Sequence, residues 1–184
     1  MTDEIHLRKK ELRKLIRQLK AHLSPAERDK RSVLLMHRIE KNEMFLKAQT
    51  IFIYWAMDDE IDTRHLIKKW SGVKKFILPA INGDELHLKE FNGAESLVAG
   101  DLYSIPEPDG QPFSDFDSIE LVLVPGIAFD GHNNRMGRGK AYYDKILHKF
   151  KGRTHLLGVC YDFQMVEEVP VEPHDIKMDG VIYA

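Results

Sequence analysis

The chain of 184 residues is long enough to bury a sizeable core without disulfides or a structural metal, and we expect one domain over residues 1–184. Its 27 basic and 29 acidic side chains nearly balance, which argues against nucleic acid as a partner, and its single cysteine, Cys160, excludes an internal disulfide or a cysteine-based zinc site. Neither a signal-peptide core nor a run of ~18 apolar residues is visible, so we expect a cytoplasmic protein with no membrane partner.

Two helices are predicted at the N-terminus. Apolar residues recur at three- and four-residue spacing within residues 5–23, which places them on one side of a helix: Leu12, Leu15, Ile16, Leu19 and Leu23. Ser24, Pro25 and Glu27 then match a capping box with proline in the first turn, which predicts a second helix reaching about Asn42. We expect these helices to form a hairpin that precedes the rest of the domain.

Strand and helix signals alternate after the hairpin. Runs of β-branched, aromatic and aliphatic residues predict strands at 50–56, 74–80, 85–91, 118–126, 154–161 and 179–184. Helices are expected at 62–72, where Asp62 is a candidate cap, and at 139–150, while residues 99–118 have the composition of a surface loop. The βαβ order predicts an α/β fold, a three-layer α/β/α sandwich with a mainly parallel sheet.

The segment "NNRMGRGKAYYDKIL", residues 133–147, follows a predicted strand and leads into a predicted helix, and we call residues 133–141 the glycine-rich loop. Ligands of open α/β sheets bind beyond the carboxyl ends of the strands, which is where this loop lies. Gly137 and Gly139 allow close backbone approach, and the loop offers a cluster of positive charges from Arg135, Arg138 and Lys140. A polyphosphate ligand is the favoured interpretation, and a solvated basic turn is the alternative.

The spacing within this segment excludes two standard phosphate motifs. A P-loop needs glycine and then serine or threonine where the chain has Asn134 and Ala141, and the dinucleotide fingerprint needs glycine in place of Tyr142. Asp144 lies about one helical turn beyond Lys140, where a carboxylate beside phosphates commonly holds Mg²⁺.

Two further groups of charged residues are candidates for binding. Lys9, Arg13 and Arg17 form a cationic row at i, i+4 spacing on the first helix, for which a solvated face is the alternative interpretation. The acidic residues 58–60 follow the first predicted strand, where they suit a cationic or amino-bearing substrate. The sequence has neither a zinc-type histidine pair nor a nucleophile elbow, so we expect catalysis by positioning and charge.

Longer segments of the chain resemble the 5-formyltetrahydrofolate cyclo-ligase family. The stretch "VPGIAFDGHNNRMGRGKAYYDKIL" is similar to the family's signature, and "KKELRK", "LSPAER", "MDDEIDTRHLI" and "VPVEPHDIKMDGVIY" resemble its N-terminal hairpin, substrate loop and C-terminus. The resemblance implies a three-layer α/β/α fold. It also implies ATP-driven closure of 5-formyltetrahydrofolate, polyglutamylated or not, to 5,10-methenyltetrahydrofolate with release of ADP and phosphate.

The resemblance further implies a set of site residues. ATP-binding positions are Lys9, Arg13, Arg135, Met136, Gly137, Arg138, Gly139, Lys140, Ala141, Tyr142 and Tyr143; folate positions are Trp55, Glu60 and Tyr142; magnesium positions are Asp144 and Asp175. Arg138 and Lys140 are the candidate catalytic residues. Many family members have glycine where this chain has Ala141, which we expect to lie inside the start of the helix with little effect.

The implied reaction suggests a mechanism. We expect the formyl oxygen to attack the γ-phosphate of ATP and give an N5-iminium phosphate, which N10 then attacks before phosphate leaves. Arg13, Arg138, Lys140 and Mg²⁺ would stabilise the developing charge.

Two other classes of function are alternatives to this one. An ATP-independent sugar-phosphate isomerase or acyl-CoA transferase-like enzyme would need the loop for a single phosphate, whereas the cations here come from two segments of the chain. An RNA-binding module would use the basic first helix, which has no stacking aromatics. We predict a monomer, because no helix has an obviously surplus apolar face.

Overall fold

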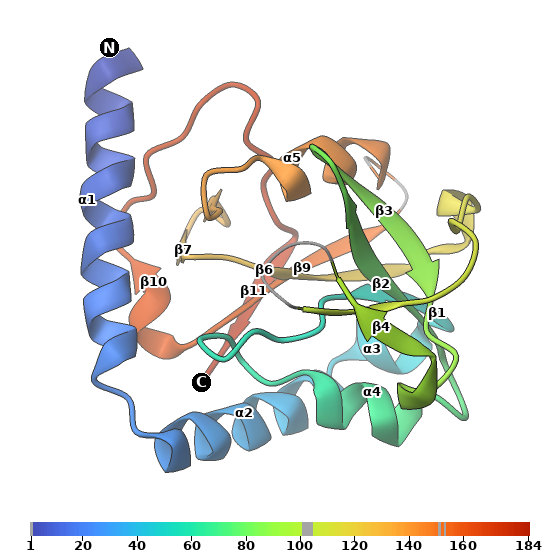
Figure 1. Cartoon of the computed structure of the whole chain (residues 1–184). Helices are drawn as coiled ribbons and strands as arrows, with labels where there is room; N and C mark the ends of the chain where they lie inside the picture. The colour runs from blue at the N-terminus through green and yellow to red at the C-terminus, as the bar shows by residue number, and fades with distance from the viewer. Residues whose placement is uncertain (1, 101–104, 151, 153) are drawn as a thin grey trace.

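The computed structural model describes residues 2–100, 105–150, 152 and 154–184. Its centre is a six-stranded sheet in the order β11-β9-β6-β1-β2-β3, in which every neighbouring pair is parallel except β2 and β3 (Figure 1). The strands are β1 (Thr50–Ile53), β2 (Lys75–Asn82), β3 (Glu85–Glu90), β6 (Leu121–Pro125), β9 (His155–Cys160) and β11 (Gly180–Tyr183). The predicted α/β fold with a mainly parallel sheet is confirmed.

Helices flank this sheet. The α-helices of the described residues are α1 (Thr2–Ala21), α2 (Pro25–Glu40), α3 (Glu43–Lys47), α4 (Arg64–Trp70) and α5 (Tyr142–Leu147). Short 3₁₀ helices lie at η1 (Ala94–Ser96), η2 (Phe116–Ser118), η3 (His148–Phe150) and η4 (Asp162–Gln164). The predicted helix over 139–150 is therefore shorter than expected, because its first residues belong to the glycine-rich loop and its last turn is η3.

The predicted cap of α2 is confirmed and that of α4 is wrong. The Ser24 hydroxyl accepts from the Glu27 N–H at 3.3 Å, and the Glu27 carboxylate accepts from the Ser24 N–H at 2.9 Å, which completes the capping box. The N-cap of α4 is Thr63. The Asp62 carboxylate still accepts from the Arg64 N–H at 2.9 Å, so it binds a donor of the first turn from one residue further out.

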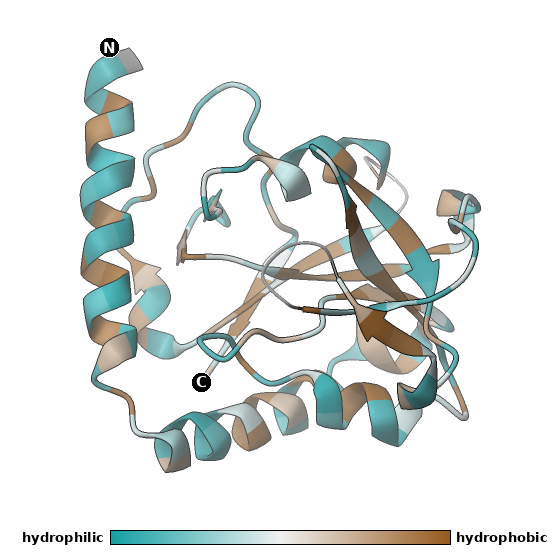
Figure 2. Ribbon diagram, viewed as in Figure 1, coloured by the Kyte–Doolittle hydropathy of each residue, from teal (hydrophilic) through white to brown (hydrophobic). Residues whose placement is uncertain are grey.

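The sheet separates two apolar layers, because successive side chains of a strand point to opposite faces. Ile51 and Ile53 of β1 pack in the same core as Leu35 of α2, whereas Phe52 packs with Ile146 of α5. Figure 1 shows α2 and α4 on one side of the sheet and α5 on the other, and Figure 2 shows mostly apolar residues along the central strands. The layers are thus helix, sheet and helix, as predicted.

Helix α1 covers a second, smaller sheet of order β10-β7-β8, formed by β7 (Ala128–Asp130), β8 (Arg135–Met136) and β10 (Met165–Val166). Ile16 of α1 is buried against Ile127 and Met136. Figure 1 shows α1 beside this sheet and α2 beneath the central one, so the two helices follow each other but cover different parts of the molecule.

Two segments predicted as loops contain strands. The strands β7 and β8 lie between the predicted strand at 118–126 and the predicted helix at 139–150, and a hairpin of β4 (Leu97–Ala99) and β5 (Pro106–Pro108) overlaps the expected loop at 99–118. Residues 101–104 of that second segment lie outside the described part of the chain. Within the described residues, no helix has both the length and the apolar character needed to cross a membrane.

Candidate active site

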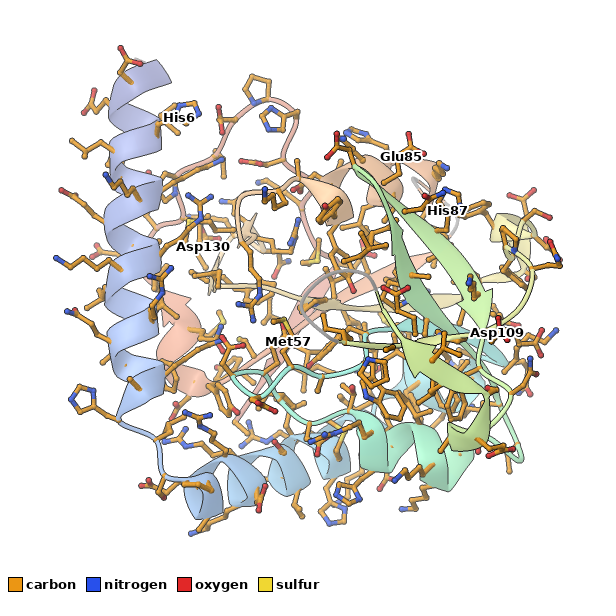
Figure 3. The ribbon with its side chains drawn as sticks, in the orientation of Figure 1. His6, Met57, Glu85, His87, Asp109 and Asp130 are labelled. Atoms are coloured by element: carbon orange, nitrogen blue, oxygen red, sulfur yellow. The ribbon has the colours of Figure 1, made fainter. Side chains whose placement is uncertain are left out.

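A cleft opens at the carboxyl ends of β1 and β6 and contains about 850 Å³ of empty space, including its mouth. Most of the predicted site residues line it: Trp55, Glu60, Arg135, Gly137, Arg138, Lys140, Ala141, Tyr142, Tyr143 and Asp144. In Figure 3, Met57 marks the cleft in the middle of the molecule, on the segment that follows β1. The structure therefore brings together the two segments that the sequence placed at strand ends.

The base of the glycine-rich loop is built around the buried carboxylate of Asp130, at the end of β7 (Figure 3). Asp130 accepts four hydrogen bonds: from the N–H groups of His132, Asn134 and Val169 at 2.9, 3.0 and 2.9 Å, and from the Asn134 side-chain amide at 2.9 Å. Burial would raise the pKa of Asp130, but these donors outweigh it and hold the pKa below its ordinary value. The carboxylate thus stays charged and fixes the turn from which β8 and the loop begin.

Arg135 and Asp144 form a buried ion pair on the cleft wall. The Arg135 guanidinium donates to Asp144 Oδ1 at 2.6 Å and to the Pro125 carbonyl at 3.3 Å, and its side chain is 2% exposed. It also lies 5.8 Å from the ring centroid of Tyr143, which stacks on Phe52. Arg135 therefore neutralises the candidate magnesium ligand and supports the cleft wall more than it offers a free charge.

Two buried donors on this wall have no partner among the described residues: Nε of Arg135 and the hydroxyl of Tyr143. Burial strongly raises the pKa of Tyr143, so its hydroxyl keeps its proton and can donate. Unsatisfied buried donors are rare in proteins, and in a cleft they are suited to a ligand with acceptor oxygens.

The backbone of the glycine-rich loop is held against α1. Nε of Arg13 donates to the Gly137 carbonyl at 3.1 Å, and Gly139 has a φ of 99° with the Arg13 guanidinium close by. Ala141 is the N-cap of α5 with φ 54° and ψ 14°, so the expectation that it lies inside the helix is wrong. A left-handed backbone disfavours every residue with a Cβ, and this explains why glycine suits the position.

Lys140 differs from the other predicted cations. Its side chain is exposed at the cleft, and no residue of the described chain pairs with it. Tyr142, two residues later, donates its hydroxyl to the Gly83 carbonyl at 3.2 Å, across the mouth of the cleft at the β2–β3 turn.

The segment 57–60, called here the acidic loop, faces the glycine-rich loop. Glu60 Oε2 accepts from the Met57 N–H at 3.1 Å, and Oε1 accepts from Arg138 at 3.0 Å. Asp59 accepts from the same guanidinium at 2.6 Å. The predicted folate ligand Glu60 and the predicted phosphate ligand Arg138 are thus ion-paired with each other.

The predicted folate contact Trp55 is buried and packs against Phe91 with ring centroids 5.9 Å apart.

Lys9 and Asp175 lie together but do not line the cleft. The buried Lys9 ammonium donates to Glu172 at 2.7 Å and to Asp175 at 2.8 Å. Burial would lower the pKa of Lys9, but the two carboxylates outweigh it and raise the pKa above its ordinary value. Among the described residues, the one group of three candidate metal ligands within 4.8 Å is Glu172, His174 and Asp175. Asp144 is not part of it, so the two predicted magnesium residues are not brought together.

Two other predicted residues of the glycine-rich loop do not line the cleft: Met136 is buried against α1, and Gly139 is exposed beside the Arg13 guanidinium. Several lining residues were not predicted: Tyr54, Met57, Pro79, Ile81, Leu86, Ile105, Glu107, Pro125 and Gly126. Most belong to strands or their ends, where an apolar residue signals only a buried face. Glu107 is the exception, since it is a buried carboxylate that accepts from the Ile81 N–H at 2.9 Å.

The fold and the cleft are typical of an α/β enzyme whose site lies at the strand ends, here between a cationic and an acidic loop. Comparison with known proteins gives the family. The sequence model of the 5-formyltetrahydrofolate cyclo-ligase family matches residues 6–184, and the chain belongs to this family. The resemblance inferred from the sequence and the prediction of a ligase-type enzyme are confirmed.

Individual relatives agree over nearly the whole chain. The chain is 28% identical to mouse 5-formyltetrahydrofolate cyclo-ligase, covering 95% of this chain and 93% of the mouse protein. It is 26% identical to the enzyme of the same name from Escherichia coli K12, covering 91% and 96%. The structure of Aquifex aeolicus 5,10-methenyltetrahydrofolate synthetase superimposes with a TM-score of 0.84 at 31% identity, covering 95% of this chain and 89% of that one. A Mycoplasma pneumoniae synthetase shares the fold, with a TM-score of 0.76 at 21% identity, covering 95% and 97%.

Proposed function

We propose that this chain catalyses the ATP- and Mg²⁺-dependent closure of 5-formyltetrahydrofolate to 5,10-methenyltetrahydrofolate, with release of ADP and phosphate. Membership of the cyclo-ligase family supports the reaction. The observation that carries the proposal is the cleft itself, in which the carboxylate of Glu60 and the cations Arg138 and Lys140 line one space. A ligase that activates a folate with a nucleotide needs a carboxylate for the folate and cations for the phosphates in the same cleft.

The folate half of the cleft is formed by the acidic loop and the ends of β2 and β3. Glu60 is suited to accept from the N–H and amino donors of a pterin ring, since a carboxylate binds such donors strongly. Pro79, Ile81 and Leu86 provide an apolar wall for the ring, next to Trp55. Tyr142 lies at the mouth, where it contacts the β2–β3 turn and can border the same substrate.

The phosphate half is formed by the glycine-rich loop, which Arg13 of α1 holds through the Gly137 carbonyl, whereas Lys9 lies outside the cleft, paired with Glu172 and Asp175. Lys140 is free to bind a phosphate oxygen, and Arg138, which contacts Asp59 and Glu60 through Nη2, can bind one through its other guanidinium nitrogens. Each cation that faces the transferred group lowers the barrier, because phosphoryl transfer depends mainly on alignment and on neutralising charge.

The proposed reaction has two steps, phosphorylation of the formyl oxygen and closure of the ring. The formyl oxygen of the substrate attacks the γ-phosphorus, the bond to the β–γ bridging oxygen breaks, and ADP leaves. In the resulting N5-iminium phosphate the formyl oxygen, a poor leaving group by itself, has become part of a phosphate, which is a good one. N10 attacks the same carbon, loses its proton and closes the ring, and inorganic phosphate departs.

Magnesium fits one of the two predicted carboxylates directly. Mg²⁺ commonly takes one or two protein carboxylates and completes its shell with phosphates and water. Asp144 lines the cleft and uses only Oδ1 for Arg135, so Oδ2 is available for the ion. Bound there with ATP, the ion would neutralise charge on the phosphates. Asp175 is enclosed by Lys9 and Glu172, so we propose for it at most a part in holding Lys9.

The test is a spectrophotometric assay of the methenyl product. Purified protein is mixed with 5-formyltetrahydrofolate and Mg-ATP, and absorbance of the product is followed together with ADP release. We expect product and ADP in equal amounts, and neither when ATP is omitted or EDTA is added. Product formation without ATP, or ATP hydrolysis that does not depend on the folate, would contradict the proposal.

The monomeric state, the single domain, the cytoplasmic location and the acceptance of polyglutamylated substrate stay predictions. Helix α1 exposes Leu7, Leu15 and Leu19 to 55%, 50% and 39%, which is apolar surface that a monomer leaves in contact with water. Sedimentation equilibrium tests that prediction directly.

A further inference from the structure

Two residues outside the predicted site, Lys20 and Asp59, form the support of Arg138. The Lys20 ammonium at the end of α1 lies 3.2 Å from Asp59 Oδ2, and its side chain is only 6% exposed. The other carboxylate oxygen of Asp59 lies 2.6 Å from Nη2 of Arg138, closer than the 3.0 Å between Arg138 and Glu60. Asp59 therefore joins two cations from distant parts of the chain, one on a helix and one on the glycine-rich loop.

The electrostatics of this group favour a fixed arrangement. Burial would raise the pKa of Asp59, but Lys20 and Arg138 outweigh it and keep the pKa below its ordinary value. Burial lowers the pKa of Lys20 although Asp59 opposes this effect. The two cations and the carboxylates of Asp59 and Glu60 compensate one another, and removing Asp59 alone would leave the buried Lys20 ammonium without its partner.

The backbone of the acidic loop is also fastened from several sides. Arg28 of α2 donates to the Asp58 carbonyl at 2.8 Å and to the Lys20 carbonyl at 3.1 Å, which joins the loop to the end of α1. Tyr161, after β9, donates its hydroxyl to the Glu60 carbonyl at 3.0 Å. A carboxylate on a loop held in this way is a rigid support for the Arg138 guanidinium.

We propose that Asp59, anchored by the buried Lys20, is a positioning residue that holds the Arg138 guanidinium at the boundary between the phosphate and folate halves of the cleft. The proposal rests on the proposed function for its turnover readout. Neither residue needs to touch a substrate, since both act through Arg138. Misplacing a charged group by about 1 Å is enough to lower a rate by about a hundredfold.

The test is a double-mutant cycle with a charge-balanced variant. Asp59→Asn alone leaves Lys20 buried and unpaired and can prevent folding, so the variant Lys20→Met/Asp59→Asn removes one charge of each sign. It is made in the wild-type chain and in Arg138→Ala. The control is the variant Lys47→Met/Glu43→Gln, which neutralises an exposed ion pair in the same way.

We expect the Lys20/Asp59 variant to lower kcat about tenfold or more and to weaken binding of a non-hydrolysable Mg-ATP analogue in calorimetry. In the Arg138→Ala background the same two changes should produce no further loss. Equal losses in both backgrounds would overturn the proposal, because the pair would then act independently of Arg138. The control variant should retain wild-type values.

Failure of the proposed function is distinguishable from failure of this inference. If wild-type protein forms no methenyl product, the proposed reaction is wrong, while the nucleotide-binding arm of the cycle still reports whether Asp59 acts through Arg138. If wild-type protein turns over and the cycle is additive, only the positioning role is wrong.

Discussion

Replacing Ala141 with glycine should stabilise this protein, although glycine in place of alanine inside a helix destabilises it. Ala141 has φ 54° and ψ 14°, in the left-handed region where a Cβ approaches the following carbonyl, at a cost of roughly 1–2 kcal/mol. Glycine removes that strain but adds about 0.4–1 kcal/mol of unfolded-state entropy. The net gain is about 0–1.6 kcal/mol with a midpoint of about 0.8 kcal/mol, and the midpoint corresponds to an increase in Tm of roughly 2–3 °C for a chain of this size.

The assay is thermal and urea unfolding of Ala141→Gly beside a matched control, Ala26→Gly. Ala26 is an exposed residue in the first turn of α2, where the backbone is helical and glycine should cost roughly 0.5–1 kcal/mol. The two substitutions remove the same methyl group but should shift Tm in opposite directions. If Ala141→Gly lowers Tm as much as Ala26→Gly does, the left-handed backbone carries no strain and the reasoning is wrong.

Three other substitutions test the cleft and its support. Lys140→Ala should lower kcat by about a hundredfold, because a charged donor is lost. The control is Lys145→Ala, which removes an exposed lysine of α5 that bonds the Asp84 carbonyl and should leave kcat unchanged. If Lys140→Ala changes only KM for ATP, Lys140 has no role in the transition state. Glu60→Gln should raise KM for the folate by about 10- to 100-fold with a smaller change in kcat, and unchanged folate binding in a titration would exclude Glu60 as its ligand. Asp130→Asn should destabilise the fold by about 2–4 kcal/mol at neutral pH, since the new amide faces donors. The pKa of Asp130 is lower in the folded than in the unfolded protein, so its contribution to the free energy of unfolding is present above the unfolded pKa and is lost as pH falls toward the folded pKa. The difference in the free energy of unfolding between wild type and Asp130→Asn should therefore shrink in acid. A difference that grows in acid would refute this.

The central sheet could be predicted because its strands have a strong local signal. The run Ile51–Ile53 and the residues of β6 are buried on both faces, which selects for continuous β-branched and aliphatic residues. The strands β8 and β10 each have two residues, which is too short for any hydrophobic period to appear. Their formation depends on α1 covering the small sheet, a tertiary effect that no window of sequence contains.

The site divides in the same way between local and distant determinants. The glycine-rich loop is contiguous in the chain, so the residue types at 135–144 and their spacing indicated its cations, its glycines and Asp144 before the fold was known. The ion pairs of Lys9 with Asp175 and of Lys20 with Asp59 span 166 and 39 residues. Such pairings depend on how α1 packs, and a helical row of lysines and arginines predicts equally well a solvated face.

These pairings change how much positive charge the cleft offers to a nucleotide. A count from the sequence gives five predicted cations: Lys9, Arg13, Arg135, Arg138 and Lys140. The described structure commits Lys9, Arg135 and Arg138 to carboxylates and Arg13 to a backbone carbonyl. Asp59 and Glu60 both contact Nη2 of Arg138, so a phosphate can bind the other guanidinium nitrogens while the carboxylates hold the side chain, but their negative charges lower the attraction at some cost to binding. Lys140 carries no such cost, and its removal should therefore reduce turnover more than the removal of any other cation of the set.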